Sequence, residues 1–477
     1  MRDNVFVAKP TYDELAALVA SQALKIQELE ATITQLRAEV TELKRRLGQN
    51  SRNSSLPPST DQLGLSATRR EQRKAGRKPG KQPGGQGFAL RRTDTPDEVI
   101  EYQPAACGGC GADLADAGEV GVSARQVTDI PKATARIVEH RLHRRRCDCG
   151  HVTTATAPAG VDRPVQYGPN IRALACYLVV FQHVPVERAA ILIADVTGAR
   201  PSTGWISGVI AQIAGMLDGP TTAVKTHLKD SPVLHVDETS VNIAGVKWWL
   251  HVACTQKLTA YHLHKSRGRV AVDEFAVLPG YTGTAVHDAL SVYDGPKYAT
   301  ARHAWCGAHI ARELIAAAAA DPDAAWCIAA IEAFHDLNNA AHQARDAGRA
   351  TISDTIADPL QHKWNHAVLC GLADNPRRPG REQSKTRNLL ERLRNHTDKV
   401  LLFAQNLSVP HTNNQAERDL RPAKTQIKIS GCHRSEQGAR AWLTIRAHIS
   451  TLRKNGINIL DGIRDSITGQ AWQPAPG

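Results

Sequence analysis

Val233-Leu-His-Val-Asp237-Glu-Thr is a short apolar, β-branched run that ends in acidic residues, and Thr284-Ala-Val-His-Asp288 has the same form further along the chain. Such runs predict strands, each delivering a carboxylate at its C-terminal tip. A third acid, Glu417, opens the polar, helix-like stretch Asn413-Asn-Gln-Ala-Glu417-Arg. Hard divalent cations prefer carboxylate oxygens on rigid elements. The three acids therefore predict a Mg²⁺ (or Mn²⁺) site with open positions for phosphate and water, as two-metal phosphoryl transfer requires.

The order of the predicted elements brings the two aspartates together. After the Asp237 strand, short polar turns separate two further strand-like runs, which favours an antiparallel meander. A helix-like stretch and the stop Pro279-Gly280 then lead to the Asp288 strand, which a right-handed crossover places parallel to the first. The ranges concerned are 247–253 and 259–263 for the strands, 270–278 for the helix and 283–287 for the last strand. This order is ribonuclease-H-like, within a multidomain α/β chain.

Several strings resemble one family. The stretch Asn413-Asn-Gln-Ala-Glu-Arg-Asp-Leu-Arg-Pro, followed by Lys428-Ile-Ser-Gly-Cys-His-Arg-Ser-Glu-Gln-Gly-Ala-Arg, is similar to the C-terminal signature of insertion-sequence-66 transposases. Asp237-Glu-Thr, Leu278-Pro-Gly-Tyr-Thr-Gly-Thr-Ala-Val-His-Asp288 and Cys306-Gly-Ala-His-Ile-Ala-Arg-Glu-Leu match the family in the same order. The resemblance covers nearly the whole chain and implies a DDE transposase whose triad is Asp237, Asp288 and Glu417.

Each of these acids also has a structural interpretation. Asp237 and Asp288 could be strand-end residues that start turns, and Glu417 stands three residues after Asn414, the spacing of a capping box. Three acids in the right order, inside the family strings, favour catalysis instead.

Three neighbouring acids compete for the same role. We expect Glu238 to point to the strand face opposite Asp237, and Asp294 to lie past the end of its strand. Asp419, two residues from Glu417, is expected on another side of the helix. None of the three is therefore assigned to the site.

Composition fits a large nucleic-acid enzyme. The chain has 477 residues, 42% of them hydrophobic, with a formal net charge of +12, which favours a polyanionic partner through counterion release. The N-terminus is charged, and the most apolar stretch, 173–181, is too short to span a bilayer, so we expect no membrane association and a cytoplasmic, nucleoid-associated protein. Ten cysteines, four of them clustered, favour reduced thiols and a metal site over disulfides.

Residues 1–48 carry a heptad repeat. Its a and d positions are Val19, Ile26, Ile33, Val40 and Leu47, and Leu15, Gln22, Leu29, Leu36 and Leu43, respectively. β-Branched residues at a with Leu at d favour a parallel two-stranded coiled coil, hence a homodimer or higher oligomer. The alternative is a lone amphipathic helix packed on its own domain.

Residues 49–95 are rich in Ser, Pro, Gly and cations and predict a flexible basic linker. Arg77 and Lys78 are candidate contacts to the DNA backbone. The alternative is a solvated linker without a binding role.

Residues 96–160 contain two cysteine pairs with metal-ligand spacing, Cys107-Gly-Gly-Cys110 and Cys147-Asp-Cys149. Four thiolates can hold structural Zn²⁺ tetrahedrally, and the family resemblance supports a zinc-finger-like DNA-binding domain here. Because the second pair is tighter than usual, His151 could replace one sulfur. Arg144 and Arg145 would place positive charge beside the metal, or would simply keep a strand edge soluble.

The remaining boundaries follow from pattern changes. Residues 161–230 are helical, with either a helix-turn-helix or a packing role; 231–302 form the first part of the core; 303–410 are a helical insertion; and 411–477 complete the core. Near the start of the insertion, Cys306-x-x-His309 fits a motif that begins a helix, with an active-site role as the alternative.

Cations follow Glu417, and of these Lys428 and Arg434 are our preferred phosphate contacts. A solvated helix face is the alternative. The sequence as a whole predicts an enzyme that binds transposon ends and target DNA, cuts them and joins them without a covalent protein intermediate, with accessory transposition proteins as further partners. The rival prediction is a zinc-containing DNA-binding regulator, derived from a transposase, whose nuclease core is inactive; an RNA-directed nuclease is a weaker third.

Overall fold

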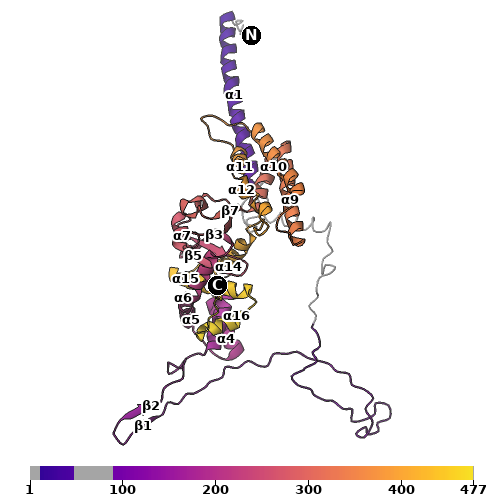
Figure 1. Ribbon diagram of the computed structural model, residues 1–477, viewed down its shortest axis with the longest axis vertical. Helices are drawn as coiled ribbons and strands as arrows, with labels where there is room; N and C mark the ends of the chain where they lie inside the picture. The colour runs from indigo at the N-terminus through magenta and orange to yellow at the C-terminus, as the bar shows by residue number, and fades with distance from the viewer. Residues whose placement is uncertain (1–10, 48–89, 476–477) are drawn as a thin grey trace, which may run out of the picture. The chain divides into compact units, whose positions relative to one another are not determined.

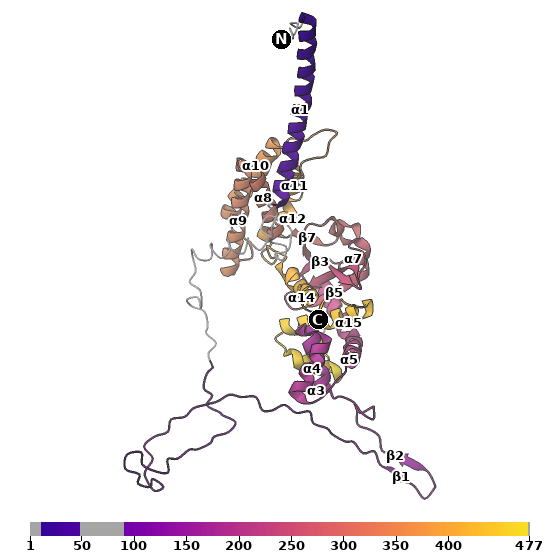
Figure 2. The same cartoon turned by 180° about the vertical axis from the view of Figure 1, so that it is seen from behind.

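The computed structural model describes residues 11–47 and 90–475 (Figures 1 and 2). The described chain divides into two compact units. One contains 90–157 and 191–201, and the other contains the remaining described residues. In the described part of the chain, no helix is both long and apolar enough to cross a membrane.

A five-stranded mixed sheet forms the centre of the larger unit (Figure 1). Its strands, in the order β5-β4-β3-β6-β7, are β3 (Val233–Ile243), β4 (Val246–Cys254), β5 (Thr259–His264), β6 (Thr284–His287) and β7 (Arg302–Trp305). β3, β4 and β5 form an antiparallel meander, and β6 lies parallel to β3, both as predicted. The carboxyl ends of β3 and β6 therefore point the same way.

The crossover between β5 and β6 has a compact core. Helix α7 (Arg269–Phe275) contacts β4 and β5 and buries Val272 and Phe275 in a core that also contains Leu234 and Val236 of β3. Burial of such a side chain contributes about 1.5–3 kcal/mol. Ahead of β6, Gly283 leaves no room for a side chain, because a Cβ there would lie 2.7 Å from the backbone oxygen of Ser231.

Two features of the sheet differ from the sequence prediction. β3 does not end at Asp237 but continues to Ile243, where a turn through Ala244 and Gly245, both with positive φ, starts β4. β7 was not predicted, and it pairs parallel with β6. It spans residue 302, assigned to the first part of the core, and residues 303–305, assigned to the predicted helical insertion, so the helices of that segment begin only after β7.

Helices fill the predicted insertion. They are α8 (Gly307–Ala320), α9 (Ala325–Asp346), α10 (Asp354–Asp374), α11 (Lys385–Asn395), α12 (Thr397–Val400) and α13 (Leu402–Gln405). They share a core around Phe334 and Trp364, both almost fully buried. Gly371 permits the close approach of α10 to Trp326 and Leu390.

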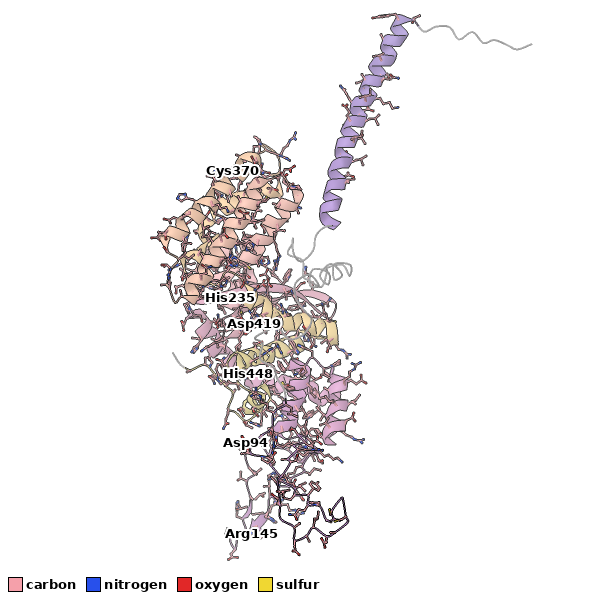
Figure 3. The ribbon with its side chains drawn as sticks, turned by 90° about the vertical axis from the view of Figure 1, so that its right-hand side faces the viewer. Asp94, Arg145, His235, Cys370, Asp419 and His448 are labelled. Atoms are coloured by element: carbon pink, nitrogen blue, oxygen red, sulfur yellow. The ribbon has the colours of Figure 1, made fainter. Side chains whose placement is uncertain are left out.

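Further helices precede and follow the strands in the sequence. They are α3 (Pro169–Cys176), the π-helix η2 (Tyr177–Phe181), α5 (Thr203–Met216), α6 (Asp218–Lys229), α14 (Asn414–Ser430), α15 (Glu436–Lys454) and α16 (Ile459–Ile467), with α4 (Val186–Thr197) contributing to both units. α14 contacts β3 and β4, and α15 contacts β5. Asp419 of α14 is buried in an ion pair with Lys454 of α15 at 2.5 Å (Figure 3).

The smaller unit has little regular structure. A two-stranded antiparallel sheet joins β1 (Arg144–Arg146) and β2 (Val152–Thr154) (Figure 3 labels Arg145).

Near the N-terminus of the chain, α1 (Tyr12–Leu47) confirms the predicted helix. Its a and d side chains Ile26, Leu29, Ile33 and Leu36 are about half exposed in the single chain. That stripe is available for a partner helix, and the coiled-coil dimer stays a prediction.

Candidate metal centre

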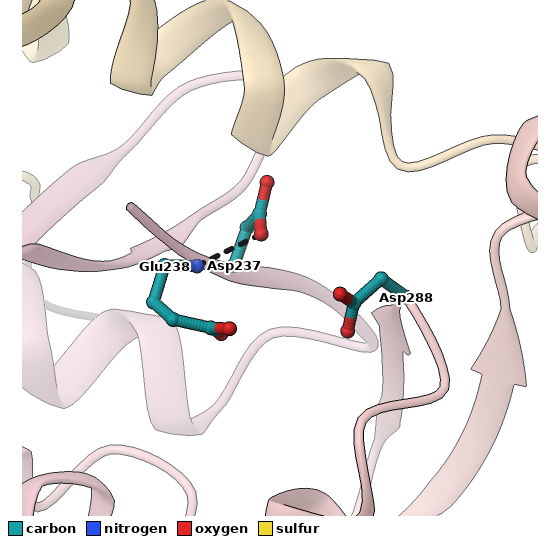
Figure 4. Close-up of side chains that lie close together, drawn as sticks. All are labelled: Asp237, Glu238 and Asp288. Atoms are coloured by element: carbon teal, nitrogen blue, oxygen red, sulfur yellow. Dashed lines mark hydrogen bonds between the residues drawn. The ribbon is translucent and has the colours of Figure 1, made fainter. Parts of the chain in front are cut away.

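Two neighbouring parallel strands bring three carboxylates together. β3 pairs with β6 through His235 and Val286, so two residues further on Asp237 lies opposite Asp288. One oxygen from each of Asp237, Glu238 and Asp288 lies within 4.8 Å of the others (Figure 4). Such a group of hard oxygen donors is suited to a divalent cation.

The turn after β6 fixes the Asp288 carboxylate. Ala289 has a φ of +65°, a left-handed conformation that is uncommon for a residue with a side chain. This turn lets the backbone N–H of Leu290 donate to Asp288 Oδ1 at 3.1 Å. The backbone N–H of Glu238 likewise donates to Asp237 Oδ1 at 2.8 Å. Both aspartates are therefore oriented by local backbone.

Glu238 belongs to this group of three carboxylates, which the sequence did not predict. Its side chain leaves β3 on the side opposite Asp237 (Figure 4), but its longer stem still brings the carboxylate close. Arg267 Nε donates to Glu238 Oε1 at 2.8 Å, and Arg267 Nη2 forms an ion pair with the same oxygen at 2.7 Å. The hydroxyl of Tyr293 donates to Oε2 at 2.6 Å. No sequence spacing pointed to Arg267 or Tyr293, because both meet Glu238 only through the fold.

Glu417 lies in the first turn of α14, as predicted, but outside this group of three oxygens. Its charge nevertheless contributes to raising the pKa of Asp237. The capping-box interpretation does not hold, because Asn413 rather than Asn414 occupies the N-cap and its side chain makes no capping hydrogen bond. Glu417 is thus not needed to cap the N-terminus of α14.

Burial and mutual repulsion perturb two of the carboxyls. Burial, followed by the charges of Glu238 and Asp288, raises the pKa of Asp237 well above its ordinary value near 3.8. Burial and the Asp288 charge also raise the pKa of Glu238, although Tyr293 and Arg267 oppose the shift. Clustered carboxyls that repel one another are relieved by a bound cation.

The other two competing acids are engaged elsewhere. Asp294 accepts from Lys399 Nζ at 3.0 Å. Asp419 accepts from Thr259 Oγ1 at 3.1 Å in addition to its ion pair with Lys454. Their exclusion from the site agrees with these contacts.

Cys306 and His309 stand at the start of α8. Cys306 is the N-cap residue, which confirms the interpretation as a motif that begins a helix. Its backbone N–H donates to the oxygen of His287, directly before Asp288, at 2.8 Å. The charges of Asp288 and Glu417 both act on His309, whose pKa is lowered by burial and by Arg312. An active-site role for His309 stays a prediction.

The predicted DNA-contacting cations are exposed where the structure describes them. Lys428 and Arg434 are exposed and have no ion pair within the described residues, and Arg144 and Arg145 are exposed on β1. The linker candidates Arg77 and Lys78 lie outside the described residues. Charges without a carboxylate partner are available to phosphate.

The four candidate zinc ligands form two separate pairs. Hydrogen bonds from the backbone and from the partner thiol lower the pKa of Cys107 and of Cys147. Lowered thiol pKa values fit metal-binding thiolates. Across the described part of the chain, however, the two pairs are not gathered within coordination distance of each other.

Comparison with known families gives three matches. A model of the transposase IS66 family matches residues 164–441, and a model of the zinc-finger binding domain of transposase IS66 matches residues 97–150. A family of unknown function matches residues 8–91. No curated protein matches the chain.

Proposed function

The chain belongs to the transposase IS66 family, and from this membership we propose that it is a metal-dependent DNA transposase that cuts at the ends of an insertion sequence and joins them to target DNA. We assign its five-stranded sheet to the ribonuclease-H-like architecture, because an antiparallel meander is followed by parallel strands in the predicted order. The helices between β7 and α14 are then an insertion within the catalytic core.

The meeting of Asp237, within β3, and Asp288, directly after β6, is the observation that carries the proposal. These two residues, with Glu417 from α14, would hold Mg²⁺ or Mn²⁺. Ions held there would supply Lewis-acid activation of water and of the attacking 3′-hydroxyl. The carboxylates hold their positions because backbone N–H groups orient both aspartates.

Glu417 would complete the set from helix α14. This helix packs directly on β3, and the negative charge of Glu417 contributes to raising the pKa of Asp237. In this arrangement Glu238 is held by Arg267 and Tyr293, so we assign it to positioning rather than to the triad.

DNA binding would involve several parts of the chain. We propose that the zinc-finger domain holds structural Zn²⁺ through Cys107, Cys110, Cys147 and Cys149 and contacts the transposon ends with Arg144 and Arg145. In the catalytic unit Lys428 and Arg434 would contact phosphates. Dimerisation through α1 and accessory transposition proteins complete the assembly, which would act on DNA of the nucleoid in the cytoplasm.

The rival function is an inactive DNA-binding regulator. An inactive regulator would not need a cluster of acids. All three acids of the triad are nevertheless present, and Asp237 and Asp288 belong to a group of carboxylates that could hold a metal ion. This observation favours the enzyme.

Incubation of the full chain with DNA that carries the element's own ends tests the proposal. Mg²⁺-dependent cleavage is expected, and Asp288→Ala should abolish it while end binding persists. Asp294→Ala is the matched control, because Asp294 pairs with Lys399 and should not bind the ions. Cleavage that survives in Asp288→Ala, or binding without any cleavage by the wild-type chain, would rule out this enzyme.

A further inference from the structure

Cations and tryptophans gather at the tip of the β3–β4 hairpin and on the segment after β5. The Nζ of Lys247 lies 4.7 Å from the ring centroid of Trp249, and the Cζ of Arg267 lies 4.9 Å from the same ring. The Nζ of Lys265 lies 5.2 Å from the ring centroid of Trp248. Because Trp248 and Trp249 are successive residues of β4, the two cation–ring groups lie on opposite faces of the hairpin. We call these five residues the hairpin patch.

Two of the three cations of the hairpin patch have no carboxylate partner within the described residues. Lys247 and Lys265 are exposed, and neither has an ion pair within the described residues. An aromatic face holds a cation in place but does not cancel its charge. Glu238 of the acidic cluster forms its ion pair with Arg267 and not with either lysine. Two lysines thus stay available to an anion outside the protein.

The hairpin patch is continuous with the candidate metal centre. Arg267 contacts the ring of Trp249 and forms a hydrogen bond and an ion pair with Glu238 of the acidic cluster. At the tip of the hairpin, Ile243 pairs with His433, and the backbone N–H of Ala244 donates to the oxygen of His433 at 2.8 Å. The tip is therefore joined to the segment that carries the next residue in sequence, Arg434.

We propose that the hairpin patch is a further DNA-binding surface, in which Lys247 and Lys265 bind backbone phosphates of DNA that leaves the metal centre. This proposal rests on the proposed function. The ring of Trp249 would hold Lys247 in place beside that path, which reduces the conformational entropy lost when a phosphate binds. Two lysines without carboxylate partners attract a polyanion, and they would repel a second copy of the same surface.

Salt-dependent binding of the full chain tests the proposal. Fluorescence anisotropy with a labelled duplex that carries the element's end, recorded in EDTA, measures binding without cleavage. The variant Lys247→Ala/Lys265→Ala should bind more weakly, and the slope of log affinity against log salt should become shallower by about 1.8, or about 0.9 for each phosphate that a lysine no longer neutralises.

Arg349→Ala/Arg378→Ala is the matched control, since it removes two exposed cations from the helical insertion. It should leave the slope near that of the wild type. An unchanged slope in the hairpin variant overturns the proposal, even where the wild-type chain binds and cuts DNA. A wild-type chain that binds no DNA would instead overturn the proposed function itself.

Variants of Trp249 separate positioning from general stability. Trp249→Leu removes the aromatic face and should weaken binding several-fold, whereas Trp249→Phe keeps the face and should recover most of it. Equal binding by Trp249→Leu and the wild-type chain would contradict the role of the ring. A lower mass of Lys247→Ala/Lys265→Ala in sedimentation, with an unchanged salt slope, would mark the hairpin patch as a subunit interface and not a DNA surface.

Discussion

The side chain of Asn413 donates a hydrogen bond from Nδ2 to the backbone oxygen of Val236 across 2.9 Å. This contact joins the start of α14, which carries Glu417, to the residue directly before Asp237. Asn413 Oδ1 also accepts from His235 Nδ1 at 2.9 Å, and its backbone N–H donates to Cys306 Sγ at 3.1 Å. One fully buried residue thus connects β3, α8 and α14 at the acidic site.

Replacement of Asn413 by alanine should loosen the position of Glu417 relative to Asp237. Removal of these side-chain hydrogen bonds leaves the Val236 oxygen and the His235 ring without partners, which costs about 1–3 kcal/mol of unfolding free energy. Single-turnover cleavage should fall by more than DNA binding, because binding does not depend on the geometry of the carboxylates.

The matched control for this variant is Asn414→Ala, since Asn414 is the exposed neighbour in the same helical turn. It should leave both denaturant unfolding and cleavage close to wild type. Equal effects of the two variants would show that Asn413 does not position the site.

Much of the catalytic region was predictable because its signals are local. Short polar turns between strand-like runs predicted the meander, and the apolar run before Asp288, reached by a right-handed crossover, predicted the parallel strand. The extension of β3 past Asp237 was not predicted, since Glu238-Thr-Ser breaks the apolar pattern. Those polar residues are tolerated because β4 pairs with them throughout.

Other parts of the site had no signal in the sequence. The membership of Glu238 in the acidic cluster depends on Arg267 and Tyr293, which lie 29 and 55 residues away along the chain. The connecting role of Asn413 depends on contacts more than 100 residues away. Strand periodicity assigns a side chain to a face but does not say how far its terminal atoms reach.

The acidic cluster should make the metal-free chain less stable at neutral pH. The pKa of Asp237 is raised in the fold above its ordinary value near 3.8, so the folded state holds this proton more tightly than the unfolded state. The contribution to stability is therefore full below pH 3.8 and is lost as the pH rises through the raised pKa. Asp237→Asn removes this loss, so at pH 8 in EDTA its Tm should exceed that of the wild-type chain, by about 2–4 °C for each kcal/mol of repulsion removed.

Addition of Mg²⁺ at pH 8 should raise the Tm of the wild-type chain and have a smaller effect on Asp237→Asn, as scanning calorimetry can measure. Asp294→Asn serves as the control, because its loss of the Lys399 ion pair brings no relief to the cluster. A Tm of Asp237→Asn equal to or below that of the wild-type chain in EDTA would argue against repulsion at the site.

The exposed stripe on α1 should mediate self-association. Ile33→Glu places a charge at an a position and should convert a dimer into a smaller species in sedimentation velocity. Gln27→Glu, at an exposed position outside the a and d stripe, should leave the mass unchanged. If Ile33→Glu has the wild-type mass, subunits associate through another part of the chain.

The two cysteine pairs should bind one Zn²⁺ per chain if the zinc-finger domain assembles around them. Elemental analysis of the full chain should then show about one zinc, and Cys107→Ser should lose it together with binding of end DNA, since thiolate coordination contributes folding free energy directly. Cys432→Ser, which alters an exposed cysteine outside the pairs, should keep both. Comparison of Cys149→Ser with His151→Asn identifies the fourth ligand, because only the variant that removes a true ligand should release zinc. A chain that binds end DNA normally yet contains no zinc would contradict the metal site and leave the cations as the source of affinity.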